Sequence, residues 1–126
     1  MKLLWVGLGG AAGSVARYLL ESLVQRSTGT SFPLGTLAVN VVGSLGMGIA
    51  MHVAIAAGAV HSTARIAVTA GLLGGFTTYS AFNQDVLEYL RRGEWATGGA
   101  YVGATVFACL AAGAIGVVLT RAALAT

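Results

Sequence analysis

The residues of this sequence that could do chemistry are uncharged polar side chains set inside long apolar segments. Two stripes of them recur at four-residue intervals: Thr36, Asn40 and Ser44, then Tyr101, Thr105 and Cys109. Residues four apart lie on one face of an α-helix, so each stripe would present hydroxyl, amide or thiol groups along one line. Such groups can bind an ion or water. No nucleophile–base pair and no cluster of metal-ligating side chains is visible in the sequence, so the stripes indicate binding or transport and no enzyme activity.

Each stripe also has a purely structural explanation. Asn40 is too polar to face lipid, but it could hold the helices together through an interhelical hydrogen bond worth about 0.6 kcal/mol. The hydroxyls of the second stripe could bond back to the carbonyl four residues earlier, as Ser and Thr do inside helices. Both explanations stay open beside the functional one.

A third feature is a run of glycine and threonine inside an apolar segment. Gly74 and Gly75 are followed by two β-branched residues, Thr77 and Thr78. A glycine raises the cost of helix by about 1 kcal/mol and a threonine by a few tenths. A break here would free carbonyls at membrane depth, where they must be buried in protein or face water or an ion. The alternative is close helix packing, because Gly71 and Gly75 have the small-xxx-small spacing.

The elements that position these residues are membrane-spanning helices. Of the 126 residues, 56% are hydrophobic and 9% are charged, against about 25% charged in ordinary soluble domains. A spanning helix needs about 20 apolar residues, and the chain accommodates four, near residues 3–25, 33–58, 62–90 and 96–121. The sequence therefore predicts an all-α integral membrane protein. It would form a single domain over residues 1–126, with four transmembrane helices and the third broken near its middle.

Charge and cysteine content exclude other classes. The net charge of +3 is spread over the predicted helix ends, so nucleic acid has no basic patch to bind. Cys109 is the lone cysteine, which rules out an intramolecular disulfide.

Several residues have expected roles at helix ends. Pro33 suits the first turn of the second helix, and Ser62 is a plausible N-cap for the third. Arg17 is expected to snorkel to the membrane interface or to pair with Glu21, one turn further on.

The positive charges give almost no preferred orientation in the membrane. Four spans place both termini on one side. That side carries Lys2, Arg65 and Arg121, and the other carries Arg26, Arg91 and Arg92, with Arg17 as a fourth if it lies near its helix end. The positive-inside rule then allows insertion both ways round. This balance predicts dual topology and an antiparallel homodimer with a two-fold axis in the membrane plane.

Three blocks of the sequence resemble the signature of the Fluc (CrcB) fluoride channels. They are Gly9-Gly10-x-x-Gly13-x-x-x-Arg17-Tyr18, Gly35-Thr36-Leu37-x-x-Asn40-x-x-Gly43-Ser44 and Gly71-x-x-Gly74-Gly75-x-Thr77-Thr78-Tyr79-Ser80-x-Phe82. The blocks cover the first three predicted helices in the right order and spacing. The chain length and the four-span plan match as well.

The resemblance implies a dual-topology homodimer with two fluoride pathways, which exports fluoride passively across the inner membrane and so protects against fluoride toxicity. The implied pathway residues are Thr36, Asn40, Tyr79, Phe82, Tyr101, Thr105 and Cys109. The backbone carbonyls of Gly74 and Thr77 would hold a structural sodium ion at the dimer centre. Tyr79 stands where the family commonly has phenylalanine. Cys109 stands where the family usually has serine, and its thiol is a weaker donor than a hydroxyl.

Two other functions fit parts of the sequence. A small multidrug-type proton-coupled antiporter is also a four-span antiparallel dimer, but it needs a carboxylate deep in the first helix, and residues 3–16 have none. A structural membrane subunit without transport activity would explain the glycines and the balanced charges. That function leaves Asn40 and the Thr77–Ser80 block unexplained.

Overall fold

The chain is helical throughout the part that the structure describes. The computed structural model describes residues 1–125, and within that range it contains helices and turns but no strand. In chain order the elements are α1 (Lys2–Thr28), α2 (Leu34–Ala56), α3 (Thr63–Ile66), the π-helix η1 (Ala67–Leu73), α4 (Gly74–Phe76), α5 (Tyr79–Arg91) and α6 (Trp95–Leu124). The predicted all-α class is confirmed, and each predicted span ends within a few residues of an observed boundary.

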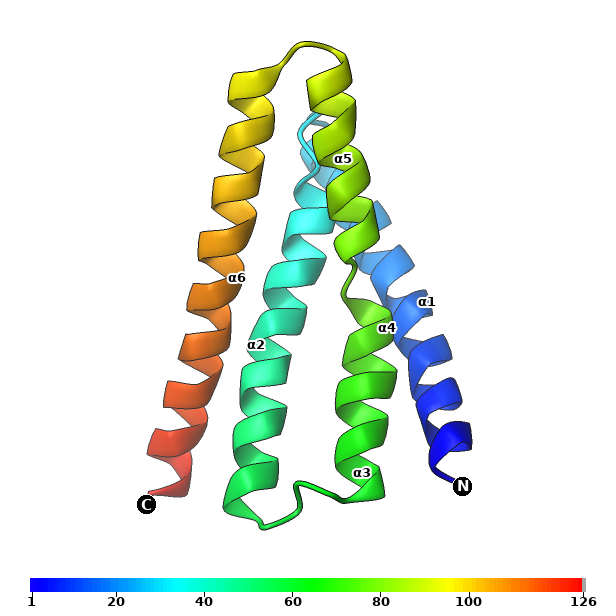
Figure 1. The fold of residues 1–126 in the computed structure, drawn as a ribbon, viewed down its shortest axis with the longest axis vertical. Coiled ribbons are helices and arrows are strands. Elements are labelled where there is room, and N and C mark those ends of the chain that lie inside the picture. The colour runs from blue at the N-terminus through cyan, green and yellow to red at the C-terminus, as the bar shows by residue number, and fades with distance from the viewer. Residues whose placement is uncertain (126) are drawn as a thin grey trace.

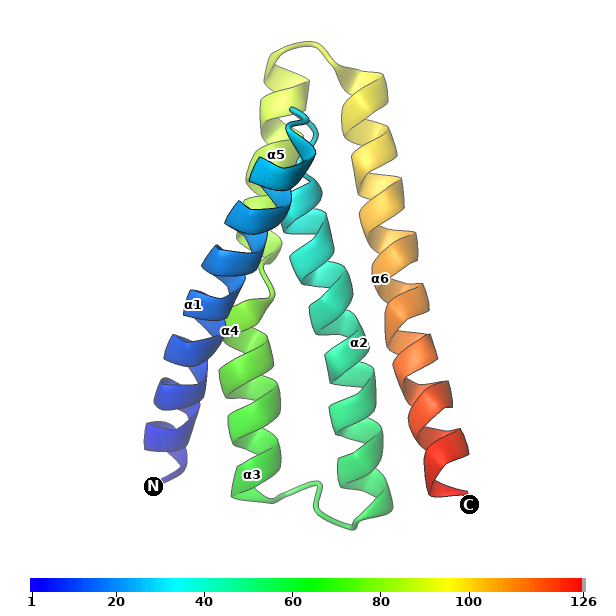
Figure 2. The same ribbon diagram turned by 180° about the vertical axis from the view of Figure 1, so that it is seen from behind.

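Figure 1 shows the helices standing side by side along the long axis of the molecule. Both ends of the chain and the α2–α3 connection lie at one end of this bundle, and the α1–α2 and α5–α6 connections lie at the other. Seen from behind (Figure 2), α1 lies over α4, with which it is in contact, and α6 lies on the far side of α2. The two termini therefore share a side, as predicted.

Within residues 1–125 three helices are long and apolar enough to cross a membrane: α1, α2 and α6. The predicted third span, residues 62–90, is divided among α3, η1, α4 and α5, and none of these pieces reaches 18 residues. In Figure 1 the pieces follow one another along the length of α2. The protein is a multi-pass membrane protein, and its most irregular segment lies among its long helices.

Glycines let α1 pack backbone to backbone against η1 and α4. A Cβ added to Gly9 would lie 2.7 Å from the carbonyl oxygen of Ala67, and one added to Gly75 would lie 2.5 Å from that of Gly10. Real Cβ atoms do not approach oxygen this closely, so only glycine fits at either position. Gly71 is buried in the same interface. The close-packing explanation for Gly71 and Gly75 is confirmed.

The core lies between α2 and α6, which pack against each other along their length. A Cβ on Gly116 would lie 2.5 Å from the carbonyl oxygen of Leu45, so these helices also approach through small residues. Val39 on α2 and Tyr101 on α6 are the largest fully buried side chains. This contact fixes the relative position of the two polar stripes.

The expected helix starts are observed. Ser62 caps α3, since its Oγ accepts a hydrogen bond from the Arg65 N–H at 3.1 Å. Pro33 comes directly before α2, and its carbonyl accepts the Leu37 N–H at 3.1 Å. Its missing N–H costs nothing there, because a helix leaves its first donors unpaired.

Candidate functional site

The helical segment after η1 is interrupted at two threonines. Thr77 and Thr78 are extended, with φ −81° and ψ 154° at the first and φ −146° and ψ 111° at the second. The helix resumes at Tyr79, where Thr78 Oγ1 accepts the Ala81 N–H at 3.2 Å and caps α5. The break predicted for the third span is confirmed.

The structure corrects the expected cause of this break. Gly74 and Gly75 are helical, in α4, so their helix-breaking cost does not place the break. The β-branched threonines that follow are the residues that leave the helix. The π-helix at Ala67–Leu73 was not predicted, although such wide turns often occur at functional sites.

Asn40 holds the break in place with both ends of its side-chain amide. Its Nδ2 donates to the Thr78 carbonyl at 3.0 Å, and its Oδ1 accepts the Thr78 N–H at 2.8 Å. Asn40 is 9% exposed, so both bonds are shielded from solvent. The interhelical hydrogen bond that was one explanation for Asn40 is therefore confirmed. The amide has a second N–H, which leaves one donor for another partner.

The break also frees two particular carbonyls. In a continuous helix the Thr78 N–H would bond to the Gly74 carbonyl, and the Ala81 N–H would bond to the Thr77 carbonyl. Here the first donates to Asn40 Oδ1 and the second to Thr78 Oγ1. The carbonyls of Gly74 and Thr77 thus lose their helical donors, and these are the two positions at which the family resemblance implies a cation.

A neighbouring carbonyl is taken by Arg17 of α1. Its Nε donates to the Gly75 carbonyl at 3.1 Å, and Ser14 Oγ lies 3.5 Å from the same oxygen. The expected pairing of Arg17 with Glu21 is wrong, because the two form no ion pair within residues 1–125. The guanidinium is directed at the end of α4 instead, and its position relative to the membrane interface stays a prediction.

Beside the break, α2, α5 and α6 enclose an open groove of about 460 Å³. Its polar lining residues are Asn40, Ser44, Thr77, Thr78, Thr105 and Cys109. Tyr79 and Phe82 add two aromatic rings from the start of α5. None of the described residues that line the groove is charged, and apolar side chains of Met47, Val106 and Leu110 complete its lining.

Thr105 is the one polar side chain of the groove that is both buried and without a partner among the described residues. It is 7% exposed, and its Oγ1 makes no hydrogen bond. It does not bond back to the carbonyl four residues earlier, although Thr120 on the same helix does so at 2.8 Å. A buried hydroxyl without a partner costs about 1–3 kcal/mol. The residue lies in the groove lining, and its oxygen is itself shielded from solvent.

A row of aromatic rings leads away from the groove. Tyr79 and Phe82 have ring centroids 5.6 Å apart, and Phe82 and Tyr101 follow at 5.2 Å. Tyr79 is 78% exposed, whereas the other two are buried. Beyond Phe82, the Tyr101 hydroxyl donates to Asp85 Oδ2 at 3.1 Å. The rings therefore connect the uncharged groove to a carboxylate.

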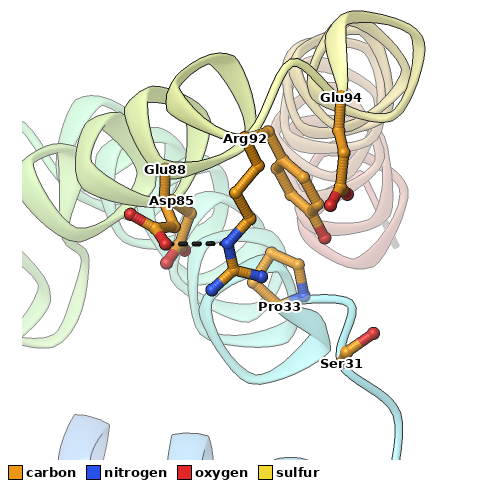
Figure 3. Close-up of a pocket in the computed structure, with 7 residues that line it drawn as sticks. Ser31, Pro33, Asp85, Glu88, Arg92 and Glu94 are labelled. Carbon is orange, nitrogen blue, oxygen red and sulfur yellow. Dashed lines mark hydrogen bonds and ion pairs between the residues drawn. The ribbon is translucent and has the colours of Figure 1, made fainter.

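That carboxylate lines a second, smaller cavity of about 170 Å³ near the α5–α6 connection. Figure 3 shows Asp85, Glu88, Arg92 and Glu94 around it, with Ser31 and Pro33 from the α1–α2 connection. Arg92 Nε donates to Glu88 Oε1 at 2.8 Å, the bond drawn in that view. This cavity is charged and lies at a helix end, unlike the groove.

The structure brings most of the predicted pathway residues together. Five of them line the groove: Asn40, Tyr79, Phe82, Thr105 and Cys109. Tyr101 lies directly beyond Phe82. Thr36 lies one turn before Asn40 on α2, is 4% exposed, and its Oγ1 donates to Glu21 Oε1 at 3.4 Å. Asn40 and Ser44 of the first polar stripe thus line the same groove as Thr105 and Cys109 of the second.

Sequence reasoning missed three residues that build this region. Thr78 pairs with Asn40, Arg17 binds the Gly75 carbonyl, and Asp85 receives the Tyr101 hydroxyl. The signal for Thr78 was its place between the break and α5, where an N-cap is needed. Nothing in the sequence points to the other two partners, because each contact joins distant segments.

The fold and the groove define a class: a helical membrane protein with an uncharged groove, lined in part by polar side chains, beside a broken helix. The family model described as CrcB-like protein, Camphor Resistance (CrcB), matches residues 4–117. The chain belongs to the CrcB family.

Relatives from several organisms carry the same name, "Fluoride-specific ion channel FluC". One from Sorangium cellulosum (strain So ce56) is 44% identical over 117 residues, which cover 93% of this chain and 92% of the relative. One from Anaeromyxobacter dehalogenans (strain 2CP-1 / ATCC BAA-258) is 45% identical over 120 residues, 95% of each chain. A third, from Geobacter sp. (strain M21), is 40% identical over 121 residues, 96% of this chain and 98% of the relative.

Proposed function

We propose that this protein is a passive, fluoride-selective channel that exports fluoride from the cytoplasm and so protects against fluoride toxicity. The observation that carries the proposal is the uncharged groove that the two polar stripes and the α5 rings line together. The fluoride channels named above, similar over almost the whole chain, support the choice of ion.

The chemistry of the groove suits fluoride. Fluoride is small and strongly hydrated, so a narrow passage must replace its water with donors while larger anions are excluded by size. The free N–H of Asn40, the Thr105 hydroxyl and the edges of Tyr79 and Phe82 are such donors, since ring edges carry positive partial charge. A fixed cation would bind the ion too tightly for it to leave, and conduction requires weak binding.

The proposed path runs from the groove toward the helix end. Cys109 and Thr105 lie on its α6 side, and Asn40 faces them from α2. From the ring of Phe82 the proposed path continues to the Tyr101 hydroxyl. Thr36 lies near the same end of the path. Tyr79 keeps a ring edge where the family commonly has phenylalanine, so its added phenolic hydroxyl is compatible with conduction.

A structural sodium ion fits the carbonyls of Gly74 and Thr77. Both have lost their helical donors, and Gly74 is exposed. Two copies of the chain would supply four oxygens, the ligand type that hard cations prefer. When bound, the sodium ion would join the subunits and satisfy these carbonyls at membrane depth.

The proposed assembly is an antiparallel, dual-topology homodimer in the inner membrane. The balanced basic residues at the two ends support it. So does the exposure of Ser80, Asn83 and Gln84 on α5, because lipid cannot satisfy such a polar face and a second subunit or water can. Reporters active on opposite sides of the membrane, fused to the C-terminus, should both give signal. Signal from one side alone would contradict the antiparallel dimer.

The transport proposal is tested by ion efflux from proteoliposomes. The purified protein should release fluoride rapidly without a proton gradient and should release chloride no faster than empty vesicles do. A small multidrug-type antiporter would instead move a cationic substrate in response to a pH gradient. A structural subunit would move none of these solutes. Either result would overturn the proposal.

A further inference from the structure

One side chain holds the α1–α2 connection, residues 29–33. Gln25, in the last turn of α1, donates from Nε2 to the Thr30 carbonyl at 2.6 Å and to the Phe32 carbonyl at 3.1 Å. Its Oε1 accepts the Gly35 N–H at 3.2 Å. Gly35 lies in the first turn of α2, where backbone N–H groups have no helical acceptor. The Gln25 amide therefore ties the end of α1 to the connection and to the start of α2.

The connection places the ring of Phe32 against two tyrosines. Its centroid lies 5.4 Å from that of Tyr101, in a T-shaped arrangement with an interplanar angle of 86°. It lies 6.5 Å from the centroid of Tyr89, and the two tyrosine centroids are 6.4 Å apart. T-shaped contacts at such distances are a preferred geometry of aromatic pairs. The three rings therefore form one cluster, which joins the connection to α5 and α6.

Tyr101 is the ring that joins this cluster to the proposed path. Phe82, which lines the groove, contacts Tyr101 at 5.2 Å, and Phe32 contacts it from the connection. The Tyr101 side chain is fully buried, and its hydroxyl donates to Asp85 Oδ2 at 3.1 Å. Because the hydroxyl lies on the axis of the ring, contacts that fix the ring also fix the place of the oxygen.

We propose that Gln25 and Phe32 are positioning residues for fluoride transport, and that they act through Tyr101. Gln25 holds the connection, the connection holds the ring of Phe32 against Tyr101, and the ring of Tyr101 then directs its hydroxyl. Neither Gln25 nor Phe32 lines the groove, so the ion does not touch them on its way to Tyr101. The inference rests on the proposed function, in which the Tyr101 hydroxyl is part of the path.

The position of the Tyr101 ring is tested by fluorine NMR on the purified full-length protein labelled with 3-fluorotyrosine. The Tyr101 signal is the one that Tyr101→Phe removes. Gln25→Met keeps the length of the side chain, removes its three hydrogen bonds and lies away from the ring, so it should shift or broaden this signal. Thr28→Val is the matched control, because Thr28 is exposed and its Oγ1 bonds within α1, to the Val24 carbonyl at 2.9 Å. A Tyr101 signal that Gln25→Met leaves unchanged would overturn the positioning role.

The effect on transport is measured by fluoride efflux from proteoliposomes that hold at most one protein assembly each. Gln25→Met should lower the initial rate by about fivefold, the size expected when one aromatic contact is lost. Phe32→Leu, which keeps an apolar side chain but removes the ring, should do the same. The final extent of release should match that of Thr28→Val, because it counts the vesicles that hold a folded protein. A lower extent at the unsubstituted rate would show a merely structural role and would overturn the proposal, as would an unchanged rate in both variants.

The two measurements separate this inference from the proposed function. If the unsubstituted protein releases no fluoride while Gln25→Met still shifts the Tyr101 signal, the channel proposal fails and the positioning of Tyr101 stands. If fluoride is released while the Tyr101 signal does not respond, the positioning role is wrong and the channel proposal stands.

Discussion

The two sides of the broken third helix use different chemistry. On the α1 side, glycines bring η1 and α4 into backbone contact with α1. Arg17 and Ser14 of α1 both donate to the Gly75 carbonyl of α4. On the side of α2 and α6, polar side chains surround an open groove, and one of them, Thr105, has no partner in the described chain. Small residues therefore close the interface with α1. The unpaired Thr105 hydroxyl lies on the other side, where the groove stays open.

The largest effect is expected on the closed side. Gly75→Leu would place a side chain against the Gly10 carbonyl, where even a Cβ would lie at 2.5 Å. Overpacking of cores costs about 1–3 kcal/mol and more against rigid backbone, so we expect loss of the folded protein in size-exclusion chromatography. Gly99→Leu is the control, because nothing lies within 4 Å of a Cβ there. A Gly75→Leu protein as stable as the control would contradict the closed interface.

The helices and their ends could be predicted from the sequence because apolar length and caps are local signals. The four-residue spacing predicts that each polar stripe lies on one face of its helix, whereas only the family resemblance places both stripes on one pathway. Contacts between distant segments could not be predicted, because Asn40 and Thr78 are 38 residues apart in the sequence, and Arg17 and Gly75 are 58 apart. Gly75 was ambiguous as well, since the same residue weakens a helix and lets helices touch. Only its neighbours in space show that it packs.

The second-largest effect is expected when a charge is placed on the side with the open groove. Asn40→Asp keeps the acceptor for the Thr78 N–H but puts a negative charge beside the path. Repulsion of an anion about 4 Å away amounts to about 4 kcal/mol at an effective dielectric constant near 20. Fluoride efflux should fall to the level of empty vesicles, while size-exclusion chromatography still shows the assembled protein. Unchanged efflux would remove Asn40 from the pathway.

A smaller effect is expected where the closed side meets the break. Arg17→Gln removes the guanidinium that binds the Gly75 carbonyl. Hydrogen bonds to charged groups contribute about 1.5–3 kcal/mol, and we expect the free energy of unfolding to fall by about that much in a denaturant titration. Arg26→Gln, at an exposed position near the end of α1, should change it by less than about 0.5 kcal/mol. Equal effects of the two substitutions would mean that Arg17 does not support the break.

The smallest effect is expected from a change of donor on the open side. Cys109→Ser replaces a weak thiol donor by a hydroxyl of similar size. Fluoride efflux should rise by a factor of about two to ten, which corresponds to at most about 1.4 kcal/mol in the barrier. Initial rates from proteoliposomes with matched protein content would measure it. An unchanged rate would indicate that Cys109 lies outside the conducting surface, and a clear fall would contradict the expected gain from the hydroxyl.

The central claim is that the open side of the break is the ion path, and Thr105→Val tests it most directly. Valine keeps the shape of threonine and removes the hydroxyl that has no partner in the described chain. Removing an unsatisfied buried hydroxyl should leave stability unchanged or raise it, so a loss of transport could not be attributed to misfolding. We predict that Thr105→Val unfolds at the same or a higher temperature. Its fluoride efflux should fall at least about tenfold, because losing one hydrogen bond of about 1.4 kcal/mol raises the barrier by that amount. Efflux at the unsubstituted rate, in a protein of equal stability, would contradict the claim.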